Sequence, residues 1–209
     1  MRQLAAEFVG TFFLNLAICL AVTGSLGSFA PVAIGLMLTV MVYACGHLSG
    51  AQFNPAVSLA FYLRGKNSLG EALVFSAVQV VAACGAALVA MALVEKAPDA
   101  VRIASAGAAV TAEAVGAFAL TWVVLNVATA RATAGNSFYG IAIGMTVTAA
   151  ALTLGRFSGG AFNPSVAVGG ALFGLFRWGD IWLHIFGSCI GGTIAAFAFR
   201  ATHPEETKA

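Results

Sequence analysis

The chain has 209 residues, of which 60% are hydrophobic and 9% are charged, with a net charge of +2 and a mean hydropathy of +0.95. In a soluble domain about 25% of the residues are charged, so these charges are too few to cover a globular surface, and the composition predicts an integral membrane protein. The low net charge, without a run of lysines and arginines, gives no sign of a nucleic-acid partner.

The apolar residues form six segments that are predicted to cross the membrane and two that are too short to do so. A span needs about 20 apolar residues. The first begins just after Met1 and runs past Ile18 without a cleavage site, so we expect an uncleaved span rather than a signal peptide. The expected spans are 4–26, 31–45, 69–94, 108–130, 138–154 and 181–199, the short stretches are 55–63 and 164–176, and the polar connections are 64–68, 95–99 and 131–137. The sequence thus predicts an all-α membrane protein with a polar, cytosolic tail at 202–209.

A Gly- and Ser-rich loop precedes each short stretch, at 46–57 and at 155–166, and both loops contain Phe-Asn-Pro. The two motifs are 109 positions apart. The same offset of 109 relates Asn54 to Asn163, Phe53 to Phe162 and Gly35 to Gly144. An offset of 106 relates two further segments, 6–12 and 112–118, which share the pattern Ala-Glu-x-x-Gly-x-Phe. This repeat predicts two halves, 1–97 and 98–209, in one channel domain. Because each half has three spans, an odd number, the second half is expected to be inserted upside down.

The Asn-Pro pairs predict how each short stretch begins. Proline suits the first turn of a helix and asparagine suits the capping position before it, so Pro55 and Pro164 should each begin a half-helix. Each helix N-terminus carries about half a positive charge. If the loops enter from opposite faces, both positive ends and the carboxamides of Asn54 and Asn163 meet near the middle of the membrane. Such a centre lines a pore, repels cations and interrupts a proton-conducting chain of water.

These motifs give the chain a resemblance to the aquaporin (major intrinsic protein) family over nearly its whole length. The matching residues are Asn54-Pro55-Ala56, Asn163-Pro164-Ser165, the Ser-Gly pairs at 49–50 and 158–159, and the two Ala-Glu-x-x-Gly-x-Phe segments. Ser165 stands where the family usually has alanine. The resemblance implies six tilted spans, two re-entrant half-helices, a pore in each protomer of a homotetramer, and location in the cell (inner) membrane.

The resemblance also assigns four residues to a constriction near the outer mouth, and here the chain departs from the family. The arginine that usually follows the second motif is replaced by Val166, and the other three positions fall on Ile34, Ala151 and Gly160. None of the four has a polar side chain, so we expect a wide, apolar filter. It should admit water and neutral solutes larger than water, such as glycerol, urea, ammonia or metalloid acids including methylated arsenicals. The alternative is a channel that passes mainly water.

Glu7, Glu113 and Gln79 are polar residues within the apolar spans. A charge in a span is costly and is expected to be paired or functional. Either the glutamates relay protons in a coupled transporter, or they accept hydrogen bonds from the backbone of a re-entrant loop. We favour the second interpretation, because one glutamate per half matches one loop per half, and we expect Gln79 to brace a loop as well. His184, in the last span, is expected to pack or to lie at an interface.

The pore mouths are predicted at His47 and at Arg156, which begin the two loops. Arg156 either reaches the lipid headgroups or turns inward toward the pore. The basic residues expected on the cytoplasmic side, with both termini, are Arg2, Arg64, Lys66, Arg131, Arg200 and Lys208, and those on the other side are Lys96, Arg102, Arg156 and Arg177. The four cysteines lie in apolar stretches without metal or redox spacing. No nucleophile, metal cluster or phosphate loop indicates an enzyme, and no cofactor is predicted.

Overall fold

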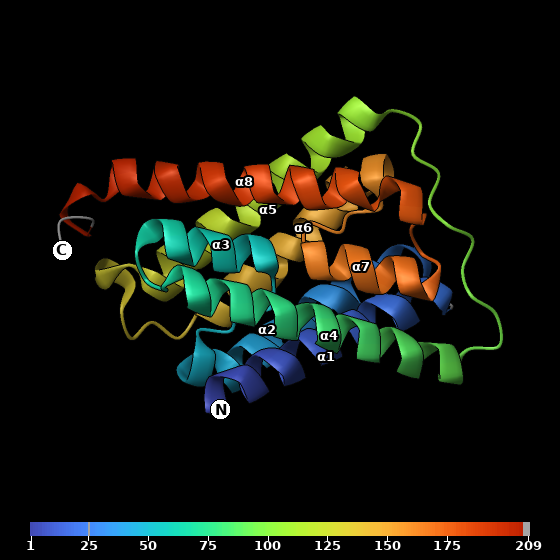
Figure 1. Ribbon diagram of the computed structural model, residues 1–209, viewed down its shortest axis with the longest axis horizontal. Helices are drawn as coiled ribbons and strands as arrows, with labels where there is room; N and C mark the ends of the chain where they lie inside the picture. The colour runs from blue at the N-terminus through green and yellow to red at the C-terminus, as the bar shows by residue number, and fades with distance from the viewer. Residues whose placement is uncertain (25, 207–209) are drawn as a thin grey trace.

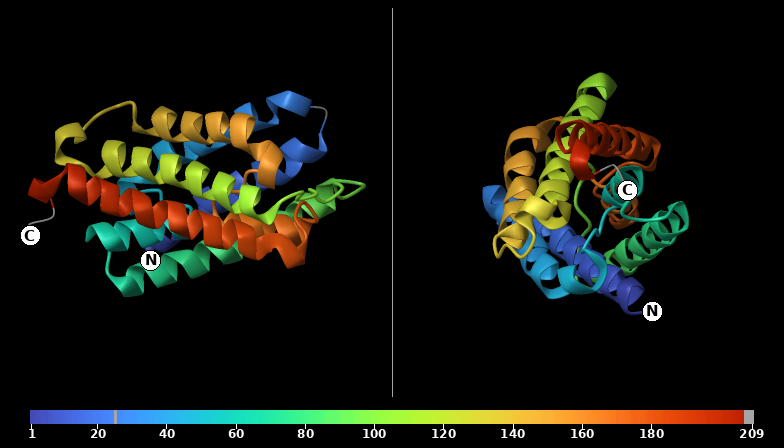
Figure 2. Two further views of the ribbon diagram at one scale, coloured as in Figure 1. Left: turned by 90° about the horizontal axis from the view of Figure 1, so that it is seen from above. Right: turned by 90° about the vertical axis from the view of Figure 1, so that its left-hand side faces the viewer.

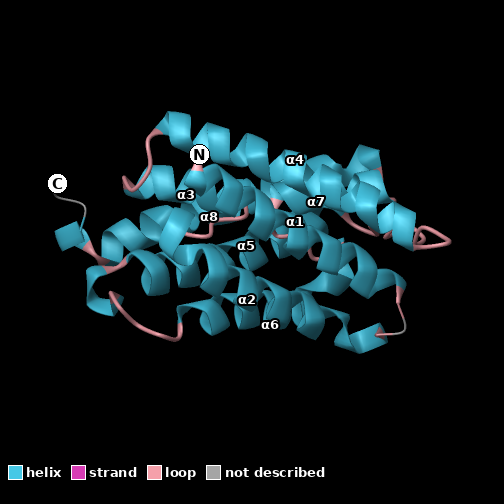
Figure 3. Ribbon diagram, turned by 90° about the horizontal axis from the view of Figure 1, so that it is seen from below, coloured by secondary structure: helices cyan, strands magenta, loops and turns pink. Residues whose placement is uncertain are grey.

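The computed structural model of the chain describes residues 1–24 and 26–206, and these residues form eight α-helices without a strand (Figures 1 and 3). The helices are α1 (Arg2–Thr23), α2 (Ala30–Ser49), α3 (Pro55–Arg64), α4 (Leu69–Leu93), α5 (Ala106–Thr129), α6 (Tyr139–Ser158), α7 (Pro164–Phe173) and α8 (Ile181–Thr202). Within this part of the chain, six helical segments are long and apolar enough to cross a membrane. The predicted all-α fold with six spans and two half-helices is confirmed.

The two re-entrant loops are shorter than the sequence predicted. Spans were expected to end at 45 and 154, but α2 and α6 continue to Ser49 and Ser158. They end where Gly50 (φ 85°) and Gly159 (φ 92°) adopt the left-handed conformation that glycine reaches without a steric cost. The second short stretch was expected to reach 176, but α7 ends at Phe173 for the same reason, with Gly174 at φ 94°.

The order of span, span, half-helix and span occurs twice along the chain. Figure 1 shows α3 and α7 on opposite halves of the long axis, with their N-termini toward the middle of the molecule. The two marked chain ends lie toward the same end of the bundle (Figures 1 and 2). Both half-helices lie between α4 and α8 and pack against them (Figure 1). This arrangement places the two Asn-Pro motifs in the centre of the bundle.

Glycines allow α2 and α6 to cross closely beside the centre. An ideal Cβ on Gly35 would lie 1.9 Å from Oγ1 of Thr148, and one on Gly144 would lie 2.0 Å from Oγ1 of Thr39. Small residues at a crossing let two backbones approach, which is the usual basis of helix packing in membranes. The four residues form two pairs with the 109-position offset, so the two halves contribute equivalent surfaces to the crossing.

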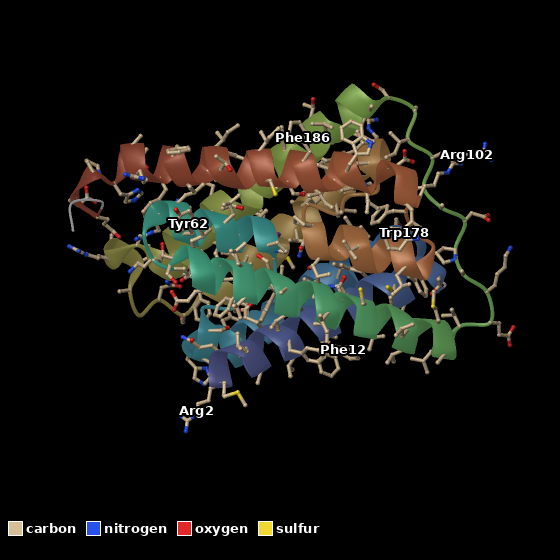
Figure 4. All side chains as sticks on the ribbon, viewed as in Figure 1. Arg2, Phe12, Tyr62, Arg102, Trp178 and Phe186 are labelled. Atoms are coloured by element: carbon tan, nitrogen blue, oxygen red, sulfur yellow. The ribbon has the colours of Figure 1, made fainter. Side chains whose placement is uncertain are left out.

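Large apolar side chains cover the outside of the bundle. Trp178 and Phe186 are 57% and 56% exposed, and Figure 4 shows both at the outer surface around α8. In the same view Arg2 and Arg102 lie toward opposite ends of the long axis. An apolar belt between charged ends is the surface that a bilayer requires. Lys208, which the charge argument also used, lies outside the described residues.

Candidate functional site

Both half-helices begin with the cap that the sequence predicts. Oδ1 of Asn54 accepts a hydrogen bond from the backbone N–H of Ala56 at 2.9 Å, and Oδ1 of Asn163 accepts one from Ser165 at 2.9 Å. The hydroxyl of Ser165 also donates to Oδ1 of Asn163, at 2.8 Å. The serine that departs from the usual alanine therefore strengthens the cap. Each carboxamide oxygen is used locally, which directs the NH₂ group away from its own helix.

The two asparagines also tie the loops to each other. Nδ2 of Asn54 donates to the carbonyl of Phe162, and Nδ2 of Asn163 donates to the carbonyl of Phe53, both at 2.9 Å. Each NH₂ group has two N–H bonds, so one remains for the lumen. These reciprocal bonds bring the two motifs together where the half-helices begin.

Glu7 braces the first loop from α1. Its Oε1 accepts from Oγ of Ser49 at 2.6 Å and from the backbone N–H of Gln52 at 2.9 Å. Its Oε2 accepts from the backbone N–H of Phe53 and from Nε2 of Gln79, both at 2.8 Å. The carboxylate is fully buried, and four donors replace the water that burial removed.

Glu113 braces the second loop in the same way from α5. Its Oε1 accepts from Oγ of Ser158 at 2.6 Å and from the N–H of Ala161 at 3.0 Å. Its Oε2 accepts from the N–H of Phe162 at 2.5 Å and from Oγ of Ser188 at 3.3 Å. The geometry of both glutamates fits the bracing interpretation.

His184 supports the second loop as well, which sequence reasoning did not find. The side chain is fully buried, so the interface interpretation is wrong. Its Nε2 lies 2.8 Å from the carbonyl O of Ser158, and its ring packs on Phe176 with centroids 4.4 Å apart. No signal in the sequence linked this histidine to a loop 26 positions earlier.

Glycines in α1 and α5 make room for the aromatic residue of each motif. An ideal Cβ on Gly10 would lie 2.0 Å from the Phe53 ring, and one on Gly116 would lie 2.3 Å from the Phe162 ring. Both rings are almost fully buried. The shared Glu-x-x-Gly pattern therefore has the same structural role in each half. The glutamate accepts hydrogen bonds from the loop backbone, and the glycine leaves room for the phenylalanine ring of that loop.

A central cavity of about 360 Å³ runs past both motifs. Asn54, Asn163 and all four residues predicted to form the constriction lie on its wall. The four are Ile34, Ala151, Gly160 and Val166. The wall residues that were not singled out from the sequence include Gln52, Val101 and Phe176. Val101 reaches the wall because the α4–α5 connection folds back, with its N–H bonded to the Leu175 carbonyl at 2.9 Å.

The two residues assigned to the mouths differ in placement. His47 lines a second hollow with Gly50, Lys66 and Asn136, which we call the His47 vestibule. Arg156 is exposed and lies over the ring of Phe157, with 4.6 Å from its guanidinium carbon to the ring centroid. It is not on the wall of the central cavity. Of the two orientations left open for Arg156, the outward one fits this geometry.

The described residues contain no group of three His, Cys, Asp or Glu side chains placed to hold a metal ion. Polar chemistry on the cavity wall comes instead from amide side chains, the backbone and two helix N-termini. These groups can donate hydrogen bonds that orient a neutral solute, and the positive helix N-termini repel a cation.

Comparison with known proteins places this geometry in a family. The profile of the family described as "Major intrinsic protein" matches residues 1–199. "Aquaporin NIP1-3" of Oryza sativa subsp. japonica is 37% identical over 210 residues, which cover 95% of this chain and 73% of that protein. "Glycerol uptake facilitator protein-like 6" of Lactiplantibacillus plantarum is 30% identical over 222 residues, covering 99% of this chain and 100% of that protein.

The fold has a counterpart among solved structures. The X-ray structure of the aquaglyceroporin from Plasmodium falciparum superposes with a TM-score of 0.82, covering 100% of this chain and 99% of that chain at 21% identity. At that identity the likeness concerns the fold. Together with the profile match over nearly the whole sequence, it leads to one conclusion: the chain belongs to the major intrinsic protein family of membrane channels.

Proposed function

We propose that this channel conducts water and also neutral solutes larger than water, through a constriction that lacks polar side chains. The observation that supports this most directly is the composition of the cavity wall. Ile34, Ala151, Gly160 and Val166 all lie on it, and none of them offers a side-chain hydrogen-bond donor. A filter without a guanidinium is wider and does not hold water in single file by strong hydrogen bonds.

Selection for neutral solutes would come from the centre of the pore. The N-termini of α3 and α7 each carry about half a positive charge and face the Asn54–Asn163 region. The free N–H of each carboxamide would donate to a solute oxygen, while a cation would meet two positive helix ends. These features favour uncharged solutes with oxygen atoms.

The names of the relatives agree with this proposal. The bacterial protein named as a glycerol uptake facilitator matches this chain from end to end. Several proteins named as aquaporins of the NIP type match as well. We therefore place glycerol-sized solutes first among the candidates, with urea, ammonia and undissociated metalloid acids beside them.

Stopped-flow light scattering on proteoliposomes tests the proposal. Vesicles containing the protein should re-swell faster than empty vesicles in glycerol, urea and arsenous acid, and should also pass water faster. Fast water flux with glycerol flux equal to that of empty vesicles would instead establish the mainly water-selective alternative.

A proton-coupled transporter is the second functional class considered. Glu7 and Glu113 are the candidate proton carriers within the spans, but both carboxylates are fully buried, accept hydrogen bonds, and are absent from the cavity wall. We expect glycerol flux to be the same with and without an imposed pH gradient. Accumulation of glycerol against its own gradient would support the transporter.

We also propose that the protein forms a homotetramer in the inner membrane with both termini in the cytoplasm. The apolar outer surface, including Trp178 and Phe186, supports membrane burial, and the chain ends lie toward the same end of the bundle (Figure 1). Native mass spectrometry would measure the oligomeric state. Protease treatment of intact spheroplasts, compared with inverted vesicles, would locate the tail.

A further inference from the structure

Three polar side chains lie on the wall of the central cavity within the described part of the chain: Gln52, Asn54 and Asn163. The two asparagines cap the half-helices and join the loops, as described above. Gln52 has neither of these tasks. Its side chain is therefore the one amide on the wall that the architecture of the loops does not explain.

The backbone holds Gln52 firmly at the edge of the pore. Its N–H donates to Oε1 of Glu7 at 2.9 Å, and the residue is only 5% exposed. An ideal Cβ on Gly50 would lie 4.0 Å from Nε2 of Gln52, and Gly50 lines the His47 vestibule. The amide thus lies on the cavity wall, on the side of Gly50 and the His47 vestibule.

A neighbouring amide fixes which end of Gln52 faces the lumen. Nδ2 of Asn67, in the turn between α3 and α4, donates to Oε1 of Gln52 at 3.4 Å. Within the described residues Nε2 of Gln52 has no hydrogen-bond partner. The fully buried side-chain atoms that lack a partner belong to Thr11, Arg64, Gln79 and Thr121, and Gln52 is not among them. Nε2 therefore keeps some accessible surface, and because Gln52 lines the central cavity, we infer that this surface faces the lumen.

The second half of the chain has no equivalent group. The residue 109 positions after Gln52 is Ala161, which also lies on the cavity wall. A side-chain donor thus follows the Asn pair on the His47 side, while the constriction side has apolar side chains only. A solute that has passed the Asn pair meets one more amide before the vestibule.

We propose that Gln52 is a specificity-determining residue, whose Nε2 donates a hydrogen bond to an oxygen of a neutral polyol on the His47 side of the Asn pair. This inference rests on the proposed conduction of solutes larger than water. A polyol enters the apolar pore partly dehydrated, and a donor on the wall replaces a lost water contact. Water molecules are small enough to hydrogen-bond to one another inside the wide pore and therefore need that donor less. Gln52 therefore favours polyols relative to water, and Asn67 acts as its positioning residue.

The test compares glycerol and water permeability of Gln52→Met in proteoliposomes. Methionine keeps the length of the side chain and removes both polar atoms. One hydrogen bond to a neutral group corresponds to a change of about two- to tenfold in rate, so we expect the glycerol-to-water ratio to fall by that factor. Gln52→His, which keeps a side-chain N–H donor at a similar distance from the backbone, should leave the ratio closer to that of the wild type. Asn67→Ala should give a smaller fall, since the amide loses its orienting contact but keeps its donors.

The outcomes separate this inference from the proposed function. A wild-type channel that passes glycerol no faster than empty vesicles overturns the proposed function. A wild type that passes glycerol, with the same glycerol-to-water ratio in Gln52→Met, overturns the role of Gln52 alone. If Gln52→Met also loses water flux because the variant does not fold, Gln52→Asn is measured in its place. That variant withdraws the donor from the lumen, and an unchanged ratio there also overturns the role.

Discussion

At the scale of a single residue, Val166 is the side chain that we propose sets the width of the constriction. It is 3% exposed and lies on the cavity wall in the first turn of α7. Val166→Arg adds length and five N–H donors at this place. We expect glycerol flux to fall by about tenfold or more, equivalent to ~1.4 kcal/mol on the barrier, while water flux falls much less. Stopped-flow measurements of both solutes on one vesicle preparation give the comparison.

Val166→Leu is the control for this change, since it adds volume without a donor. It should lower glycerol flux less than arginine does. If Val166→Arg reduced water and glycerol flux by the same factor, Val166 would not lie in the constriction.

At the scale of the elements, the α2–α6 crossing holds the wall of the pore in place. A methyl group on Gly35 would meet Oγ1 of Thr148 at 1.9 Å and the carbonyl O of Gly144 at 2.6 Å. Overpacking of this kind costs about 1–3 kcal/mol, so Gly35→Ala should lower the thermal unfolding midpoint in detergent. Gly85→Ala is the matched control, because its Cβ would make an ordinary contact at 3.8 Å with the Phe12 ring.

A second substitution separates the two obstacles at Gly35. Adding Thr148→Ala removes the hydroxyl but not the Gly144 carbonyl, so the double variant should regain only part of the lost stability. Equal unfolding midpoints for Gly35→Ala and Gly85→Ala would mean that α2 and α6 pack less closely at Gly35 than the structure shows.

At the scale of the whole molecule, one buried ion pair joins the tail to both halves. The carboxylate of Glu206, in the 3₁₀ turn Pro204–Glu206, contacts the guanidinium of Arg64 at the end of α3, and the two side chains are 4% and 3% exposed. Arg64 also donates to the carbonyl of Thr129 at 2.8 Å and lies 4.5 Å over the Phe199 ring. The N–H of Arg131 donates to Glu206 at 2.7 Å. The tail thus fastens α3, α5 and α8 at one end of the bundle.

This cluster predicts how stability depends on pH. Burial by itself favours the neutral acid, but the Arg131 N–H and the Arg64 charge together hold the pKa of Glu206 below its usual value. The stabilisation is therefore complete above the ordinary glutamate pKa of about 4.3 and is lost as pH falls through the lowered pKa. Glu206→Gln breaks a buried pair, which costs about 3–5 kcal/mol, so it should melt earlier at pH 7 and respond less to acid.

The exposed neighbour Glu205 provides the control, since Glu205→Gln should melt like the wild type at both pH values. An unchanged melting temperature of Glu206→Gln at pH 7 would mean that the tail contributes nothing to the fold.

The sequence by itself determined the class of the protein and the core of the pore. Charges too few for a soluble surface, six apolar segments and two Asn-Pro motifs 109 positions apart follow from residue types and spacing alone. Capping by Asn54 and Asn163 is equally local, because the donor and acceptor lie two residues apart. For the same reason the start of each half-helix could be predicted to the residue, whereas the ends of α2 and α6 could not. The last turn of each is polar, and Ser49 and Ser158 in these turns donate to Glu7 and Glu113 of other spans.

Only the tertiary structure decided which polar side chains face the lumen. Gln52 lies in the first loop and Gln79 and His184 lie in spans, and residue type alone does not say which of these side chains reaches the cavity wall. Gln79 donates a hydrogen bond to Glu7, 72 positions away, and His184 bonds to the carbonyl of Ser158 in the second loop, 26 positions away. Of the three, Gln52 alone lies on the cavity wall. It accepts a hydrogen bond from Asn67, which is 15 positions away, beyond α3. Hydrogen-bond partners so far apart in the chain meet only when the helices pack, and a pattern read along the sequence does not contain that information.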